Sequence, residues 1–202
     1  MIDTLPGFVL AGLALAGSPG PATLSLAATG AAFGPRSGLA YMAGILAGMV
    51  AVMIMSGTGI VALLLALPGA TPAVTALAAG YFLYLAWRIA TAPPLSAVPR
   101  DSPGSGPRPG FADGLFLSLA NPKGYAAMAA LFSGFVLVTG RPVADLAVKC
   151  AVLILIIAAV NAAWLLAGVA LAGLARHPAT GRAINLAFAV LLLLSVAATF
   201  LL

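Results

Sequence analysis

Charge is what this 202-residue sequence lacks most. It contains no glutamate and only four aspartates, and 6% of its residues are charged, against roughly 25% in a typical globular chain. No Asp, Glu, Lys or Arg occurs in residues 4–35, 37–87, 150–175 and 183–202. Because a membrane-spanning helix needs only about 20 apolar residues, the sequence predicts an all-α, polytopic membrane protein and excludes a soluble domain.

Cysteine and histidine are also scarce, with one of each, Cys150 and His177. A single cysteine can form neither an internal disulfide nor a dithiol pair, which excludes thiol-redox chemistry. Metal hydrolysis needs clustered His or carboxylates, and an intramembrane protease needs a serine–histidine pair or two aspartates within the bilayer. The histidine falls in an expected loop and the aspartates fall near helix ends. We therefore expect neither an enzyme nor a cofactor or metal site.

Glycine, proline and charge divide the apolar sequence into six expected membrane helices. They lie near residues 5–33, 38–67, 71–91, 111–138, 145–172 and 183–202. The only long polar stretch, APPLSAVPRDSPGSGPRPG at 92–110, contains six prolines and reads as an extended linker. The expected organisation is a three-helix repeat at 1–91, a linker at 92–110 and a second three-helix repeat at 111–202.

The two repeats resemble each other weakly at an offset of 103 residues. The dipeptide Gly-Phe at 7–8 recurs at 110–111, and Pro19 matches Pro122. An odd number of helices in each repeat gives the two copies opposite orientations, which is the arrangement of inverted-repeat secondary transporters.

The positive charges predict the orientation of the chain in the membrane. They are scattered between the apolar runs, so the net charge of +5 indicates topology and not a nucleic-acid partner. Six lie on the side of the linker and two on the other side, which places the linker in the cytoplasm and both termini outside. The six are Arg36, Arg88, Arg100, Arg108, Arg176 and Arg182, and the two are Arg141 and Lys149.

Two of the expected helices are broken near their middle, the first at SPGP (18–21) and the fourth at NPK (121–123). Proline removes a backbone donor, and the residue before it is pushed away from helical geometry. Unpaired backbone groups are tolerated at membrane depth only where protein buries them or water reaches them. Each break therefore predicts a cavity or a close interface near the bilayer midplane, although such kinks can also serve packing alone.

The half-helix that starts at each break directs its N–H groups and its positive dipole end at that point, which suits an anion such as a substrate carboxylate. Lys123 adds a full positive charge there. A charge at this depth in the membrane costs at least about 2.5–3.5 kcal/mol, so Lys123 is a candidate functional residue. The alternative is that its side chain extends to the membrane interface. Asn161, within the fifth helix, can bind a substrate amine or join helices. The expected substrate site comprises Ser18, Pro19, Gly20, Pro21, Thr23, Asn121, Pro122, Lys123 and Asn161.

Asp113 is the candidate for a coupling residue. It lies at the start of the fourth expected helix, where it either carries a proton or stabilises the helix start through the dipole.

Three blocks of sequence resemble the LysE/RhtB family of amino-acid exporters. They are GSPGPATLSLAATGAAFGPRSGLAYMAGILAGM (17–49), AAGYFLYLAWRI (78–89) and GFADGLFLSLANPKGYAAMAALFSGF (110–135). The Pro-Gly-Pro motif of the family falls on residues 19–21 and its Asn-Pro-Lys motif on residues 121–123. The resemblance implies efflux of amino acids or their derivatives across a bacterial inner membrane, driven by the proton motive force or by antiport.

One departure from the family bears on the substrate. Some relatives carry an acidic residue in the first half of the membrane region, but residues 4–87 contain none. Without a buried carboxylate to pair a second ammonium, a neutral amino acid is favoured over lysine or arginine. The alternative is a transporter or channel for another small solute or ion of the wider superfamily. The expected partners are a small-molecule substrate and membrane lipid, and the apolar surface is compatible with a homodimer.

Overall fold

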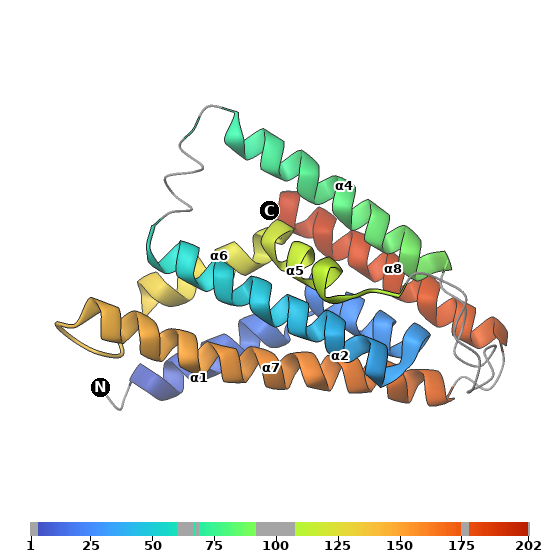
Figure 1. The fold of residues 1–202 in the computed structure, drawn as a ribbon, viewed down its shortest axis with the longest axis horizontal. Coiled ribbons are helices and arrows are strands. Elements are labelled where there is room, and N and C mark those ends of the chain that lie inside the picture. Colours follow the sequence, from blue (N-terminus) through green and yellow to red (C-terminus); the bar gives the residue numbers. More distant parts are fainter. Residues whose placement is uncertain (1–3, 60–66, 68, 92–107, 175–177, 202) are drawn as a thin grey trace.

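The computed structural model describes residues 4–59, 67, 69–91, 108–174 and 178–201, which contain helices and no strands. The all-α prediction is confirmed for this part of the chain. Most of the expected linker, residues 60–66 of the second expected helix, and Arg176 and His177 lie outside the described residues. The helices, labelled as in Figure 1, are α1 (Thr4–Gly17), α2 (Pro21–Gly57), α4 (Ala70–Thr91), α5 (Phe111–Ala120), α6 (Pro122–Gly134), α7 (Pro142–Leu174) and α8 (Pro178–Leu201).

Several helix boundaries differ from the prediction, and the largest difference is at the second expected helix, because α2 ends at Gly57 instead of residue 67. α7 begins at Pro142 instead of residue 145, and α8 begins at Pro178 instead of residue 183. Proline suits the first position of a helix because its φ is already helical and an N–H there would have no intrahelical partner. α6 ends at Gly134 instead of residue 138, and in the connection that follows, the carboxylate of Asp145 accepts hydrogen bonds from the N–H groups of residues 137–138.

α2 reverses direction at Gly34 and so consists of two antiparallel arms, residues 21–33 and 35–57. Gly34 has φ 76° and ψ 177°, and glycine adopts such a positive φ without a steric penalty. The Tyr41 hydroxyl donates to the Ser25 hydroxyl at 3.0 Å, although sixteen residues separate them in the chain. In a straight helix they would be roughly 24 Å apart. The reversal lies where the sequence predicts the connection between the first two membrane helices.

Both predicted helix breaks are present. Residues 18–20 separate α1 from α2, and Asn121 alone separates α5 from α6. The second half-helix begins with Pro21 in one case and with Pro122 in the other. At the offset of 103 residues Pro19 aligns with Pro122, whereas the second half-helices begin at Pro21 and Pro122, because the first break is two residues longer.

Glycines allow close contacts between helices. A Cβ added to Gly44 in α2 would overlap the carbonyl oxygen of Phe111 in α5, and one added to Gly114 in α5 would overlap the backbone of α2. Gly168 of α7 approaches the backbone of Ala27 in α2 in the same way. Small residues allow such approach between membrane helices. α2 is therefore held between α5 and α7, while α4 packs on α8 (Figure 1).

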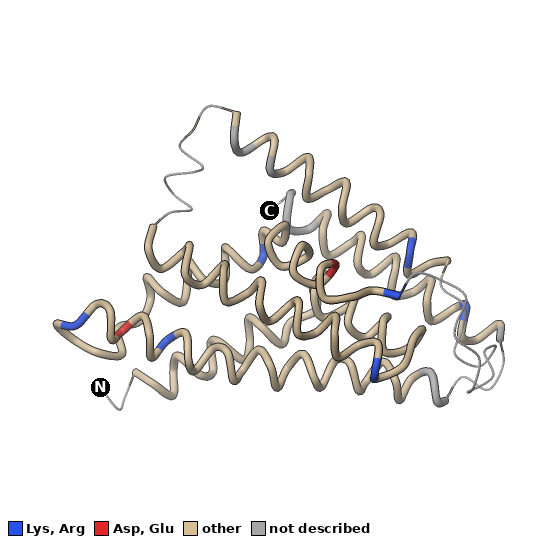
Figure 2. Tube along the Cα trace, in the orientation of Figure 1, with Lys and Arg blue, Asp and Glu red and all other residues tan. Residues whose placement is uncertain are grey.

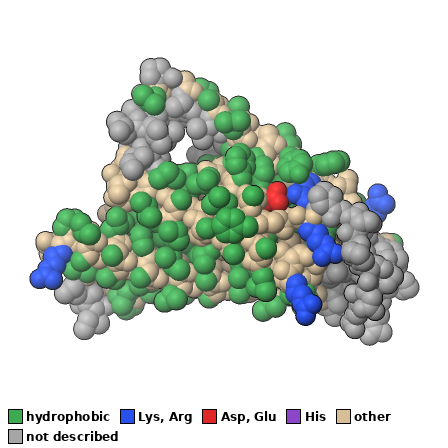
Figure 3. Space-filling model, in the orientation of Figure 1, with side chains coloured by type: hydrophobic (Ala, Val, Ile, Leu, Met, Phe, Trp, Pro, Cys, Tyr) green, Lys and Arg blue, Asp and Glu red, His purple; other side chains and the backbone are tan. Residues whose placement is uncertain are grey.

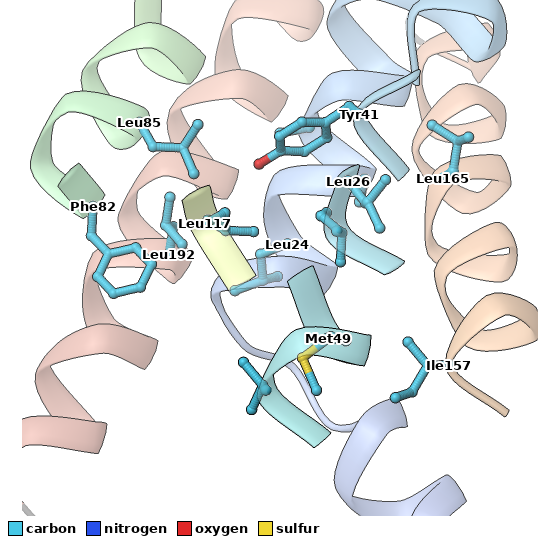
Figure 4. Close-up of a cluster of buried hydrophobic side chains, with 14 of the residues drawn as sticks. Leu24, Leu26, Tyr41, Met49, Phe82, Leu85, Leu117, Ile157, Leu165 and Leu192 are labelled. Atoms are coloured by element: carbon cyan, nitrogen blue, oxygen red, sulfur yellow. The ribbon is translucent and has the colours of Figure 1, made fainter. Parts of the chain in front are cut away.

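The core lies where these helices meet, and most of its members are apolar. Because lipid is as apolar as a leucine side chain, burial away from lipid gives little drive for helix association, and stability depends on close packing. Figure 4 shows side chains of this region. They include Leu24, Leu26, Tyr41 and Met49 of α2, Phe82 and Leu85 of α4, Leu117 of α5, Ile157 and Leu165 of α7, and Leu192 of α8.

The outer surface is apolar along the middle of the molecule (Figure 3), and most Lys and Arg residues lie towards the ends of its longest axis (Figure 2). Leu10 and Leu155 are 67% and 72% exposed, which suits contact with lipid. Within the described residues, three stretches are long and apolar enough to cross a membrane, although the first reverses at Gly34. They are Pro21–Gly57, Pro142–Leu171 and Ala179–Ala197.

The Gly44 contact predicts the effect of adding one methyl group. Gly44→Ala forces α2 away from α5, and overpacking of this kind costs about 1–3 kcal/mol. We expect a lower midpoint in thermal unfolding of the detergent-solubilised protein, followed by circular dichroism. Gly80→Ala in α4 is the matched control, because a Cβ at Gly80 has no neighbour within 4 Å. Equal midpoints for the two variants would contradict the close packing of α2 on α5.

Candidate functional site

The side chain of Lys123, at the start of α6, reaches across to the first helix break. Its ammonium donates hydrogen bonds to the carbonyl oxygen of Ser18 at 2.8 Å, to the hydroxyl of Ser18 at 2.7 Å and to the carbonyl oxygen of Pro19 at 3.2 Å. A lysine ammonium has three N–H donors, so these contacts engage all of them. The sequence predicts that this ammonium binds a substrate carboxylate. In the structure it binds the carbonyl oxygens of Ser18 and Pro19, in the other half of the chain, instead.

These contacts satisfy the carbonyl end of α1. The last carbonyl groups of a helix have no intrahelical partner and form the negative end of its dipole, so a cation is favoured there. Trp164 of α7 contributes as well, because its indole N–H donates to the carbonyl oxygen of Gly17 at 3.3 Å. No local sequence pattern indicates this role of Trp164, because 147 residues separate it from Gly17.

Gly20 makes room for the lysine side chain. A Cβ at this position would lie 2.8 Å from Nζ and 3.0 Å from Cδ of Lys123, closer than carbon atoms normally approach. The glycine between the two prolines of the first break therefore has a packing role in addition to freeing the backbone.

The N-termini of the two second half-helices are not equivalent. In α6, the Asn121 side chain caps the helix by accepting from the backbone N–H of Lys123 at 3.2 Å. In α2, the capping position is Gly20, which has no side chain to accept a hydrogen bond. The backbone N–H groups of Ala22 and Thr23 consequently make no hydrogen bond within the described part of the chain. Of these two N-termini, the one of α2 has backbone N–H groups without a hydrogen-bond partner among the described residues, and these groups can donate to an anion.

A cavity of about 70 Å³ lies between the two breaks. One water molecule needs roughly 10–15 Å³ by this measure, so the cavity has room for a few waters or a small ligand. None of its lining residues is acidic, and Lys123 is the one charged side chain among them. The lining comprises Gly12, Leu15, Ala16, Gly20, Pro21, Ala22, Thr23, Ile45, Met49, Asn121, Lys123, Gly124, Ala127, Met128, Leu131, Leu153, Ile157 and Asn161.

Asn161 of α7 lines the cavity and has an unsatisfied polar group. The residue is 3% exposed, and its amide Nδ2 has no hydrogen-bond partner among the described residues. An unpaired buried donor costs about 1–3 kcal/mol, so such groups are rare in folded proteins and call for an explanation. A ligand that supplies the missing partner is one such explanation.

The structure brings most of the predicted site residues together. Six of them line the cavity, namely Gly20, Pro21, Thr23, Asn121, Lys123 and Asn161, while Ser18 and Pro19 hold the ammonium of Lys123. Pro122 begins α6 without lining the cavity. The apolar wall was missed, because it combines residues of α1, both arms of α2, α6 and α7 that only the packing brings together.

Asp113 does not line the cavity. One of its carboxylate oxygens lies 3.3 Å from Nη1 of Arg88, and the other accepts a hydrogen bond from the backbone N–H of Gly110 at 2.8 Å. The Tyr81 hydroxyl donates to its backbone carbonyl. These contacts fasten the start of α5 to α4.

The sequence matches the LysE type translocator family over residues 13–202. The chain belongs to this family. LysE type translocators are membrane transporters, so this one is a multi-pass membrane protein that acts on a small-molecule substrate in a lipid environment, and it is not an enzyme. No curated protein and no solved structure matches the chain.

In this translocator, the cap on α6 can be tested by itself. Asn121→Ala removes the acceptor of the Lys123 backbone N–H, and loss of such a cap costs about 0.5–2 kcal/mol. We expect the thermal midpoint in detergent to fall, and Asn121→Ser, which keeps a side-chain oxygen, to recover most of the loss. An equal fall in both variants would show that Asn121 does not stabilise the start of α6.

Proposed function

We propose that this translocator is a secondary transporter that exports neutral amino acids or their derivatives from the bacterial cytoplasm, driven by the proton motive force. The observation that carries the proposal is the cavity between the two helix breaks, with one cationic side chain and one unpaired amide on otherwise largely apolar walls. Secondary transporters commonly bind substrate near the bilayer midplane between discontinuous helices. The substrate site consists of the predicted residues of both breaks together with Asn161.

The chain crosses the membrane six times, as two inverted repeats at 1–91 and 111–202 joined by the linker at 92–110. Helix lengths support this count, because α1 has 14 residues and α5 has 10, whereas a crossing needs about 20. α1 together with the arm at 21–33, and α5 together with α6, each reach that length. Each repeat then has three crossings, which inverts the second relative to the first.

The chemistry of the cavity favours a neutral substrate over a basic one. A second ammonium group would meet no carboxylate among the lining residues, and an unpaired charge on an apolar wall is costly. An aliphatic side chain would contact Ile45, Met49, Met128 and Ile157 instead. Methionine adapts its shape readily, which suits a wall that accepts several small side chains.

We place the linker in the cytoplasm, both termini in the periplasm and the protein in the bacterial inner membrane. Cytoplasmic connections carry an excess of Lys and Arg. Figure 2 shows more Lys and Arg at the end where the chain enters and leaves the segment 92–107 than at the opposite end, which supports this orientation.

Transport by the purified protein in proteoliposomes tests the proposal. We expect exchange of glycine, alanine, serine, valine or leucine that responds to an imposed proton gradient and exceeds exchange of lysine or arginine. Lys123→Ala should lower gradient-driven transport at least about tenfold, equivalent to roughly 1.4 kcal/mol, while the protein stays folded. Arg141→Ala, which removes a basic residue outside the cavity, is the control. Downhill flux at channel rates that ignores the gradient would contradict an exporter, and unchanged transport by Lys123→Ala would contradict the site.

Asp113 is the proposed coupling residue, and its role can be tested separately. Asp113→Asn keeps an oxygen that can accept from Gly110 but removes the group that takes up a proton. If Asp113 carries the coupling proton, we expect amino-acid exchange to persist while its dependence on the proton gradient is lost. A variant that still responds fully to the gradient would leave Asp113 with only its contacts at the start of α5.

A further inference from the structure

The first helix break presents two backbone ends of opposite polarity. The carbonyl oxygens of Ser18 and Pro19 continue the negative end of α1, and the N–H groups of Ala22 and Thr23 form the positive end of α2. The two ends are close together, because the Thr23 hydroxyl lies 3.5 Å from the carbonyl oxygen of Ser18. The break therefore offers acceptors and donors side by side.

An α-amino acid carries the complementary pair of charges on one carbon atom. We propose that the first break binds both, with the substrate ammonium at the carbonyl oxygens of Ser18 and Pro19 and the carboxylate at the N–H groups of Ala22 and Thr23. In the absence of substrate, Lys123 occupies the ammonium position. This inference rests on the proposed function and assigns the chemistry of its substrate site.

Lys123 already makes the contacts that a substrate ammonium would make. Both are primary ammonium groups with three donors, and Nζ lies 2.8 Å and 3.2 Å from the two carbonyl oxygens. Two ammonium groups at the same oxygens would repel each other, so the substrate displaces Lys123 when it binds. Because Lys123 belongs to α6 and the carbonyl groups follow α1, each binding event releases a contact between the two halves of the chain.

The unpaired amide of Asn161 completes the carboxylate end of the site. It lines the same cavity as Ala22 and Thr23, it is almost fully buried, and its Nδ2 lacks an acceptor among the described residues. A carboxylate has two oxygens and accepts several hydrogen bonds, so it can pair with the helix N-terminus and with the amide together. The N-terminus of α6 does not compete, since Asn121 already caps it.

Small ammonium ions test the ammonium position without knowledge of the substrate. Lys123→Ala leaves the carbonyl oxygens of Ser18 and Pro19 without their cation and opens space in front of them. We expect methylammonium chloride to raise the thermal midpoint of this variant by about 3–6 °C at a roughly tenfold excess over its Kd. Tetramethylammonium chloride, with the same charge and no N–H donor, and sodium chloride should not raise it. The wild type should respond equally to all three salts.

A glycine pair tests the contact of Lys123 with the first break. A Cβ at Gly20 meets Nζ of Lys123, whereas a Cβ at Gly17 has no neighbour within 4 Å. We expect Gly20→Ala to lower the thermal midpoint, Gly17→Ala not to lower it, and the Gly20→Ala effect to shrink in a Lys123→Ala background. Equal effects of Gly20→Ala in both backgrounds would show that Lys123 does not rest on Gly20.

Binding of the amino acid that the wild type exchanges fastest tests the displacement. Because Lys123 competes for the site, removing it should leave the Kd unchanged or lower it several-fold, even though gradient-driven transport is lost. Lys123→Met, which keeps the length of the side chain without a donor, serves where Lys123→Ala does not fold. In the wild type, the deaminated analogue of the amino acid should compete poorly.

The outcomes separate the inference from the proposed function. Loss of amino-acid binding in both Lys123 variants would mean that Lys123 pairs with the substrate carboxylate directly, which overturns the inference and leaves the exporter intact. Equal responses of Lys123→Ala to methylammonium and tetramethylammonium would also overturn it. A wild type that transports no amino acid would overturn the proposed function, while the two ammonium salts would still decide whether the carbonyl groups form a cation site.

Discussion

The fold of this translocator depends on how the backbone groups freed by two helix breaks are satisfied inside an apolar molecule. Water cannot pair with them in lipid, so the chain has to supply partners of its own. It does so across the two halves, since the ammonium of Lys123 and the indole N–H of Trp164 serve the carbonyl end of α1. At the second break, Asn121 pairs with the helix that follows it. On the wall of the cavity, the groups without a partner among the described residues are the N–H groups at the start of α2 and the amide of Asn161.

The close packing of glycines follows from the same constraint. A bundle with little hydrophobic drive between its helices is stabilised by contact area and by the fit of backbone against backbone. Gly44, Gly114 and Gly168 give α2 such contacts on both sides, with α5 and with α7. The reversal at Gly34 then brings the first break against the arm at 35–57, so residues that are distant in sequence surround one cavity. The first break therefore differs from an ordinary kink because of its position within the bundle, more than because of its residue types.

Much of this arrangement could be predicted from the sequence, because its signals are local. Proline and glycine mark the breaks and the reversal, and runs without charge mark the membrane helices. The proline starts of α7 and α8 are not marked by the runs without charge, because Asp145 and Arg182 lie inside these helices. The partner of Lys123 was missed for a different reason. A sequence shows that a charge lies at membrane depth, but it does not show which backbone groups of another helix come within reach.

The contact between Lys123 and Ser18 also has a consequence for the order in which the chain is made. The two residues are 105 positions apart, which corresponds to roughly 5–20 s of synthesis by a ribosome. During that interval α1 and both arms of α2 have been made, and the carbonyl groups of Ser18 and Pro19 still await their cation. Until Lys123 has been made, these carbonyl groups therefore have to form hydrogen bonds with water or contact the insertion machinery. The carbonyl end of α1 acquires its partner only after α6 has been made.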